Sequence, residues 1–129
     1  MDRNLLNISS IESYLYSILQ GKVSDNTYVG SLPATLQSEW KDICLIDCGS
    51  AITDLDALGG GVVLIWLYAK PMAGIKNVGT LKTMEEKLNE VIKPACHPNY
   101  KINRRNTYTD YDADRDWHCN IVELNIVIV

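Results

Sequence analysis

Two stretches of the chain repeat apolar residues every three to four positions, the spacing of a helix that buries one face. The first covers residues 10–20, and its apolar stripe consists of Ile11, Tyr14, Leu15, Ile18 and Leu19. The second covers residues 80–93, and its stripe consists of Leu81, Met84, Leu88, Val91 and Ile92. The pattern predicts two amphipathic helices.

Residues at the ends of these stretches fit helix termini. Ser9 followed by Glu12 has the spacing of a capping box, and Gly21 suits the left-handed position after a helix. Thr80 is a suitable cap for the second helix, and Pro94 is expected to end it.

Other apolar runs are continuous, which is typical of strands. Residues 43–48 and 62–69 predict two strands, and the second is apolar on both faces. Residues 100–109 and 117–129 predict a hairpin, joined by a turn at 110–116. The order of elements predicts one α+β domain over residues 1–129: an antiparallel sheet of four to five strands with two helices packed on one face.

Residues 21–41 are rich in Gly, Pro and polar residues and predict mostly irregular chain. Tyr28-Val29 indicates a short strand there. Leu32, Leu36 and Trp40 are spaced by four, which also fits a single helical turn. An irregular stretch of this length is often functional.

The composition of the chain argues against several classes of function. The 129 residues include 12 Lys plus Arg and 16 Asp plus Glu, a net charge of −4. An acidic chain argues against binding to nucleic acid or an anionic membrane, because both need a basic face. No apolar run approaches the roughly 20 residues of a membrane span. The N-terminal MDRNLLNISS does not read as a secretory signal.

The acidic run from Asp110 to Asp116 is the strongest candidate for metal chemistry, because hard cations prefer several oxygen ligands. The EF-hand pattern fails, since Arg115 stands where glycine is required and Ile121 where glutamate is required. We therefore favour the interpretation that the run is an exposed hairpin tip whose charges keep it soluble. A small metal-binding module or metal-dependent hydrolase remains the alternative function.

The four cysteines do not have metal-site spacing. Cys44 and Cys48 would lie roughly 13 Å apart along one strand, too far to share one ion. The adjacent pairs Cys96-His97 and His118-Cys119 would point apart on extended chain. Nucleophilic catalysis would need a Cys–His pair oriented by a carboxylate such as Asp47 or Asp54, and the presence of these residue types in a sequence is not specific for it. Buried reduced thiols are expected, with no catalytic residue, cofactor or metal.

The glycine run and the basic residues have structural interpretations that need no ligand. Gly59-Gly60-Gly61 predicts a flexible turn, because it precedes a strand and lacks the Lys-Ser/Thr of a phosphate-binding loop. Lys101, Arg104 and Arg105 form a basic stripe in which the two arginines should face opposite sides of the strand. Such a cluster usually pairs with nearby acids.

Apolar surface is in excess of what two helices can cover. Residues 62–69 and 122–129 are apolar on both faces, so the second face needs loops or another copy of the chain to cover it. An interaction protein explains this excess. The best candidate contact segments are the loop 70–79 and the hairpin tip, and the candidate contact residues are Met72, Ile75, Tyr111, Asp112 and Asp114.

Most of the chain resembles the tail-terminator, or tail-completion, proteins of long-tailed bacteriophages and prophages. The resemblance is carried by the order of elements with their patterns. These are the N-terminal helix, the segment Tyr28-Val29…Leu32-Pro33, the strands 43–48 and 62–69, the helix 81–92 after a glycine-rich loop, and a final hairpin ending in an apolar strand. No diagnostic motif contributes, and the cysteines and the Tyr/Asp-rich hairpin depart from the family pattern.

The resemblance implies a small α+β subunit without enzymatic activity. Such subunits assemble into a ring, typically hexameric, that caps the tail tube at the head–tail junction. The implied partners are further copies of the chain and the tail-tube and neck proteins. The implied location is the cytoplasm of the bacterial host during assembly and the tail or neck of the virion afterwards.

Overall fold

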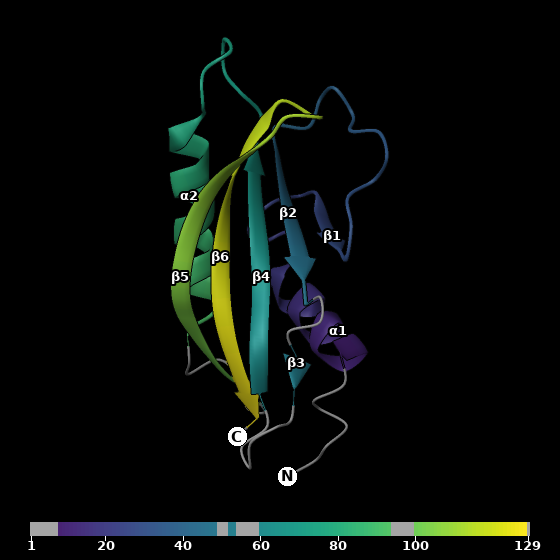
Figure 1. The fold of residues 1–129 in the computed structure, drawn as a ribbon, viewed down its shortest axis with the longest axis vertical. Helices are drawn as coiled ribbons and strands as arrows, with labels where there is room; N and C mark the ends of the chain where they lie inside the picture. Colours follow the sequence, from purple (N-terminus) through teal and green to yellow (C-terminus); the bar gives the residue numbers. More distant parts are fainter. Residues whose placement is uncertain (1–7, 49–51, 54–59, 94–99, 129) are drawn as a thin grey trace.

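The computed structural model describes residues 8–48, 52–53, 60–93 and 100–128 of the chain. Two helices and six strands form an α+β fold (Figure 1), as the sequence predicted. In chain order they are α1 Ile8–Leu19, β1 Thr27–Val29, β2 Asp42–Asp47, β3 Ile52–Thr53, β4 Gly60–Ala69, α2 Val78–Val91, β5 Tyr100–Asp112 and β6 Trp117–Ile128.

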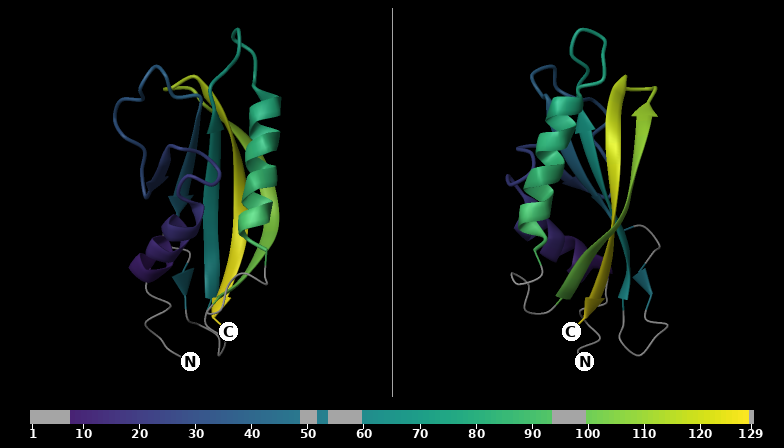
Figure 2. Two further views of the ribbon diagram at one scale, coloured as in Figure 1. Left: turned by 180° about the vertical axis from the view of Figure 1, so that it is seen from behind. Right: turned by 90° about the vertical axis from the view of Figure 1, so that its left-hand side faces the viewer.

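Both helices pack on the same face of the sheet, which we call the helix face (Figure 2). Their stripes pack against the sheet as predicted: Leu15, Leu19 and Leu88 have no exposed surface, while Tyr14, Ile18 and Val91 are partly buried. The strands contribute alternate residues to this core: Cys44 and Ile46 from β2, Val63, Ile65, Leu67 and Ala69 from β4, and Val122, Leu124 and Ile126 from β6. The opposite face is called the outer face below.

The helix ends differ in detail from the sequence prediction. Ser9 lies inside α1, so the helix starts before the predicted capping box. Gly21 has the expected positive φ of 72°. The cap of α2 is Asn77 rather than Thr80, since the Asn77 side chain accepts a hydrogen bond of 3.1 Å from the Thr80 backbone N–H. Pro94 lies outside the described residues.

The strand order is β1-β2-β4-β6-β5, with the short β3 paired to one end of β4. All pairs are antiparallel except β1 and β2, which run parallel and correct the prediction of a purely antiparallel sheet. Gly60 and Gly61 belong to β4 and pair with both β3 and β6, so this part of the glycine run is strand rather than turn. Gly59 lies outside the described residues.

Residues 30–41 cover one end of the outer face. Ile43, Leu45, Tyr68, Trp117 and Cys119 are buried on that face, and the partly buried side chains packed against them include Leu32, Leu36 and Trp40. Residues 30–41 form no helix, so the helical turn suggested by the spacing of four is wrong. A loop therefore covers this part of the apolar surface. The sequence allowed either a loop or another copy of the chain in this place.

Candidate functional site

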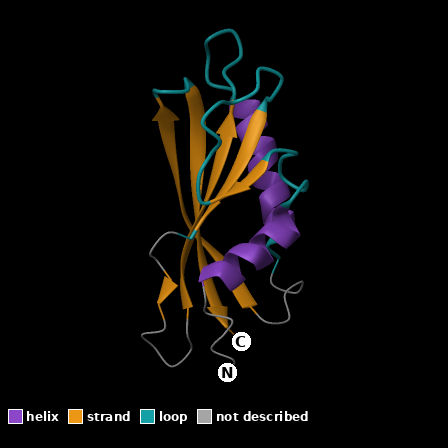
Figure 3. Ribbon diagram, turned by 90° about the vertical axis from the view of Figure 1, so that its right-hand side faces the viewer, coloured by secondary structure: helices purple, strands orange, loops and turns teal. Residues whose placement is uncertain are grey.

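Three connections meet at one end of the molecule, opposite the end where the described chain starts and finishes (Figures 1 and 3). They are residues 30–41, the loop 70–77 between β4 and α2, and the turn 113–116 between β5 and β6. We call this region the loop end. The Lys70 ammonium donates to the Ser38 carbonyl at 3.0 Å, and the Lys76 ammonium donates to the Thr109 hydroxyl at 2.6 Å. These bonds tie the loop 70–77 to its neighbours.

The tip of the loop 70–77 is a tight two-residue turn. Met72 and Ile75 exchange backbone hydrogen bonds of 2.9 and 3.0 Å across it. Ala73 and Gly74 both have positive φ, 53° and 77°, which is the pattern of a type I′ turn. Glycine adopts this conformation readily, whereas alanine is strained in it. The two reciprocal hydrogen bonds place Met72 and Ile75 opposite each other at the base of the turn.

The apolar side chains at the loop end are exposed to solvent. Met72 is 66 %, Ile75 70 % and Val78 62 % exposed, and Tyr111, next to the end of β5, is 45 % exposed. Four of the five large apolar side chains that are exposed in the described residues therefore lie at this end, with Tyr108 the fifth. Apolar side chains that gather on one surface commonly mark a contact with another protein.

The hairpin turn uses part of its acidic run to fix its own backbone. The Asp112 carboxylate accepts from the backbone N–H groups of Asp114 and Arg115 at 3.1 and 3.2 Å, and pairs with the Arg115 guanidinium at 2.9 Å. The Tyr111 hydroxyl donates to the Asp116 carboxylate, which raises the pKa of Tyr111. Asp112 is thus a structural residue of the turn, while Asp114 is exposed and available for contact.

The carboxylates of the hairpin do not converge on one point. Asp112 and Asp116 each have a protein partner, and Asp110 accepts a 2.8 Å hydrogen bond from the Tyr111 backbone N–H. Within the ranges that the structure describes, no group of three or more His, Cys, Asp or Glu residues is placed to hold a metal ion.

The three described cysteines are buried free thiols. Cys44 and Cys48 lie in the helix-face core, whereas Cys119 lies on the outer face. Burial raises the pKa of Cys44 and Cys48 to about 12 and that of Cys119 to about 11, with nearby carboxylates adding to the effect. Such thiols are poor nucleophiles at neutral pH, because the thiolate is the reactive form.

The structure does not bring together the cysteine–histidine pairs considered from the sequence. His118 and Cys119 are neighbours on β6, so their side chains point to opposite faces of the sheet. Cys96, His97 and Asp54 lie outside the described residues.

The outer face is only partly covered beyond the reach of residues 30–41. Trp66 and Ile121 are opposite each other on β4 and β6 and are half-buried. The next residue across the sheet is Tyr108 on β5, which is 49 % exposed. Ile126 of β6, in contrast, is 2 % exposed and points into the helix-face core. It therefore contributes nothing to the apolar surface of the outer face.

The basic stripe of β5 is distributed over both faces, as the alternation predicted. The Arg104 guanidinium pairs with Glu85 of α2 at 3.1 Å, and Arg105 pairs with Glu123 of β6 at 3.4 Å. Lys101 is exposed. A register shift between Arg104 and Thr107 interrupts the pairing of β5 with β6.

In the described part of the chain neither helix is long and apolar enough to span a membrane. Comparison of the whole sequence with protein-family models gives no matching family, and comparison with curated proteins gives no matching relative.

Proposed function

We propose that this chain is a non-enzymatic structural subunit of a phage or prophage tail, resembling a tail-terminator protein. In this function, copies of the chain form a ring that caps the tail tube at the head–tail junction. The α+β architecture with both helices on one face of the sheet agrees with the fold that the resemblance implies. In this role the protein acts by surface complementarity to its partners and catalyses no reaction.

One observation carries the proposal. The loop end presents Met72 and Ile75 on a hydrogen-bonded two-residue turn, close to the exposed start of α2 and to the hairpin, instead of burying them. Each fully buried side chain of this size contributes about 1.5–3 kcal/mol, so leaving both in water has a cost that a partner would remove. A binding surface explains why they are exposed.

The same arrangement gives a simple mechanism for ending a tail. The loop end of each subunit contacts the last ring of tail-tube protein. Among the described residues, the exposed large apolar side chains other than Tyr108 lie at the loop end, so a further tube ring is expected to find no equivalent contact on the other side of the ring. Addition stops because the two ends of the ring differ.

Two measurements test the proposal together. Light scattering over a concentration series should show association beyond the monomer, and mass spectrometry of purified virions or tails should detect the protein. Removing the gene should give tails of irregular and excessive length in electron micrographs. A protein that is strictly monomeric at every concentration and absent from purified particles contradicts the proposal.

Variants of the loop 70–77 test whether the exposed side chains of Met72 and Ile75 bind the tail. The double variant Met72→Ser/Ile75→Ser should fold normally and fail to bind assembled tails. The matched control Lys87→Ser changes an exposed residue of α2, outside the loop end, and should bind as the unchanged protein does. Equal binding by both variants would show that the turn is not the contact surface.

The metal-binding alternative has no comparable support. Its acidic residues stabilise the hairpin turn, as described above for Asp112 and Asp116. Elemental analysis of the purified protein tests it directly, because a metal-dependent enzyme would contain a stoichiometric ion.

A further inference from the structure

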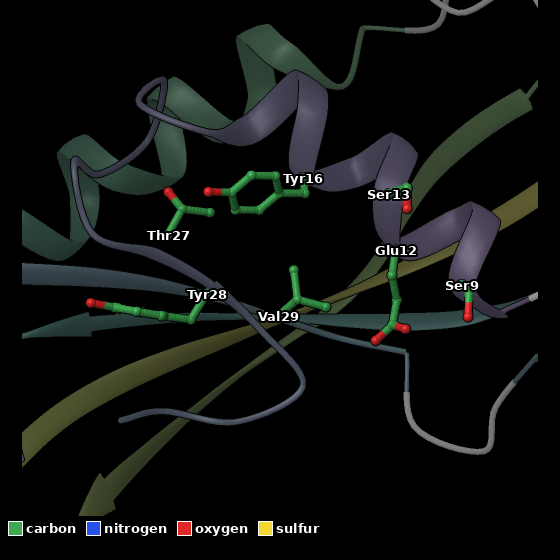
Figure 4. A pocket seen from close by; sticks show the side chains of 7 residues that line it. All are labelled: Ser9, Glu12, Ser13, Tyr16, Thr27, Tyr28 and Val29. Atoms are coloured by element: carbon green, nitrogen blue, oxygen red, sulfur yellow. The ribbon is translucent and has the colours of Figure 1, made fainter. Parts of the chain in front are cut away.

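An open groove of about 530 Å³ runs between α1 and β1, the short strand at one edge of the sheet. Its strand wall consists of Thr27, Tyr28 and Val29, and its helix wall consists of Ser9, Glu12, Ser13 and Tyr16. Figure 4 shows Tyr16 and Glu12 extending from α1 towards the strand. The helix-wall residues are spaced so that they share one side of α1. The groove is therefore bounded by one helix face and one free strand edge.

The backbone of β1 leaves hydrogen-bonding groups on its free edge, the edge that is not paired with β2. The Asn26 carbonyl accepts from the Cys44 N–H, and the Gly30 N–H donates to the Ile46 carbonyl, both at 2.9 Å. Residues of a strand alternate in the side to which their backbone groups point. Because Asn26 and Gly30 face β2, Thr27 and Val29 direct their N–H and C=O groups to the free edge. These are the groups that an added strand would pair with.

The groove carries one charge, the carboxylate of Glu12. The remaining side chains are hydroxyl-bearing or apolar. An extended segment that brings a basic side chain to the helix side of the added strand matches this lining, because an opposite charge would offset the desolvation of the carboxylate.

We infer that the groove receives residues 100–104 of β5 from a second copy of the chain. β5 is the edge strand at the other end of the sheet order, so this contact joins unlike edges and is head-to-tail. The inference rests on the proposed ring and specifies how neighbouring subunits meet.

Charge and length both favour this segment of β5. Positions 101–105 contain three of the twelve basic residues of a chain whose net charge is −4. Arg104 lies on the helix face of its own sheet, where it pairs with Glu85. If the sheet continues with the helices on the same side, Arg104 keeps its partners Glu85 and Asn89 and lies on the side of Glu12, so its positive charge also attracts the Glu12 carboxylate of the neighbouring copy. The register shift after Arg104 ends the regular part of β5, which leaves a short segment comparable to the short β1.

The lateral groove and the loop end are separate surfaces. The groove lies along α1, and the loop end lies at the opposite end of the sheet (Figure 1). One subunit can therefore contact its neighbour through β1 and the tail tube through the loop end at the same time.

The variant Val29→Pro tests the contact through the backbone. Proline removes the N–H that points to the free edge, and leaves the N–H groups used in the pairing with β2. We expect the monomer to keep its circular dichroism spectrum and urea midpoint, while the dissociation constant of the oligomer, measured by sedimentation, rises at least tenfold. The control Val29→Ile retains the N–H and should assemble normally.

Charge reversal provides a second test in case Val29→Pro fails to fold. Glu12→Lys should weaken assembly at least tenfold, and Glu12→Gln should weaken it less. Glu86→Lys makes the same change of charge on the exposed side of α2 and should have little effect. Assembly of Glu12→Lys with unchanged affinity overturns the inference.

Photo-crosslinking identifies the occupant. A photoreactive phenylalanine analogue at Ser13, an exposed residue of the groove, should crosslink to a peptide that contains residues 100–105 of another copy. A crosslink to any other segment or protein, or none in assembled rings, overturns the inference and leaves the proposed ring intact. The proposed function fails separately, if the unchanged protein neither assembles nor occurs in tails.

Discussion

Arg104 of the edge strand β5 and Glu85 of α2 form an ion pair in which the guanidinium Nη2 lies 3.1 Å from the carboxylate. The pair belongs to a network, because Arg104 also donates to the Asn89 side chain at 2.9 Å, and Glu85 accepts from the Asn120 side chain at 2.9 Å. The network fastens the helix to the outermost two strands. The side chains of the ion pair are 29 % and 24 % exposed, which reduces the screening that weakens surface pairs.

Arg104→Ala should lower the free energy of unfolding by about 1–2 kcal/mol, because it breaks a partly buried pair and leaves Glu85 with one partner fewer. Urea denaturation followed by circular dichroism measures the change. The control Glu90→Ala breaks the exposed Lys93–Glu90 pair and should cost no more than about 0.5 kcal/mol. Equal losses for the two variants would show that the Arg104 network is not stabilising.

Leu88→Ala should lower the free energy of unfolding by about 2–4 kcal/mol, because Leu88 is fully buried between α2 and the sheet and its truncation leaves a cavity. Chemical denaturation is again the measurement. Lys87→Ala, on the neighbouring exposed position, is the matched control and should leave the midpoint nearly unchanged. A loss below 1 kcal/mol for Leu88→Ala would contradict the described packing.

Asp112→Ala should destabilise the hairpin by about 1 kcal/mol, because it removes the acceptor of two backbone N–H groups and the partner of Arg115. Asp114→Ala should have no measurable effect on stability, since Asp114 is exposed. Hydrogen exchange of the β5 and β6 amides near the turn separates the two variants. The reverse order of effects would show that Asp112 is the contact residue and Asp114 the structural one.

Stability should fall when the pH rises above about 9. In the unfolded chain the thiols ionise near their ordinary pKa of 9.0, whereas burial first, and carboxylates second, hold the pKa of Cys44 and Cys48 at about 12. The unfolded state therefore loses its protons first, and each thiol contributes up to about 1.4 kcal/mol per pH unit between these values. The stabilisation is complete below pH 9 and is lost towards pH 12.

Denaturation at pH 7 and at pH 10 measures this slope. The variant Cys44→Ala/Cys48→Ala should show a shallower decline over the same range, because two of the thiols are gone. An identical pH dependence of the variant and the unchanged protein would exclude these cysteines as its cause.

The helices could be predicted from the sequence because their signal is local. A buried stripe such as Leu81, Met84 and Leu88 recurs within one turn or two, so each segment specifies its own face. Capping is less certain, since several polar residues compete near a helix start. Asn77 caps α2 because its side chain reaches the Thr80 N–H, and the sequence offered Thr80 as an equally suitable residue.

Pairing between distant segments could not be predicted in the same way. The parallel alignment of β1 with β2 depends on how residues 30–41 turn the chain, and three residues carry no sign of their direction. The spacing of Leu32, Leu36 and Trp40 indicated a helix, but these side chains are buried against the outer face without one. Pro33 lacks a backbone N–H and restricts Leu32, which favours an irregular path.

The contact role of the candidate residues stays a prediction, and the structure shows where their side chains lie. Met72 and Ile75 are exposed, as their place between turn-forming residues suggested. The part played by Asp112 in the turn depends on the position of Arg115, which side-chain type alone does not reveal. The β1 groove left no signal in the sequence, because it is formed by a helix wall and backbone groups instead of a motif.

The position of β6 between β4 and β5 affects how the chain can fold during synthesis. β5 has no other strand neighbour, and β4 pairs with β6 along ten residues. A ribosome that has finished residue 112 has therefore made every other element of the sheet, while β4 and β5 still lack the strand that joins them. At this stage the edge of β4 that later pairs with β6 is open, and an unpaired apolar strand edge favours aggregation until residues 117–128 have been made.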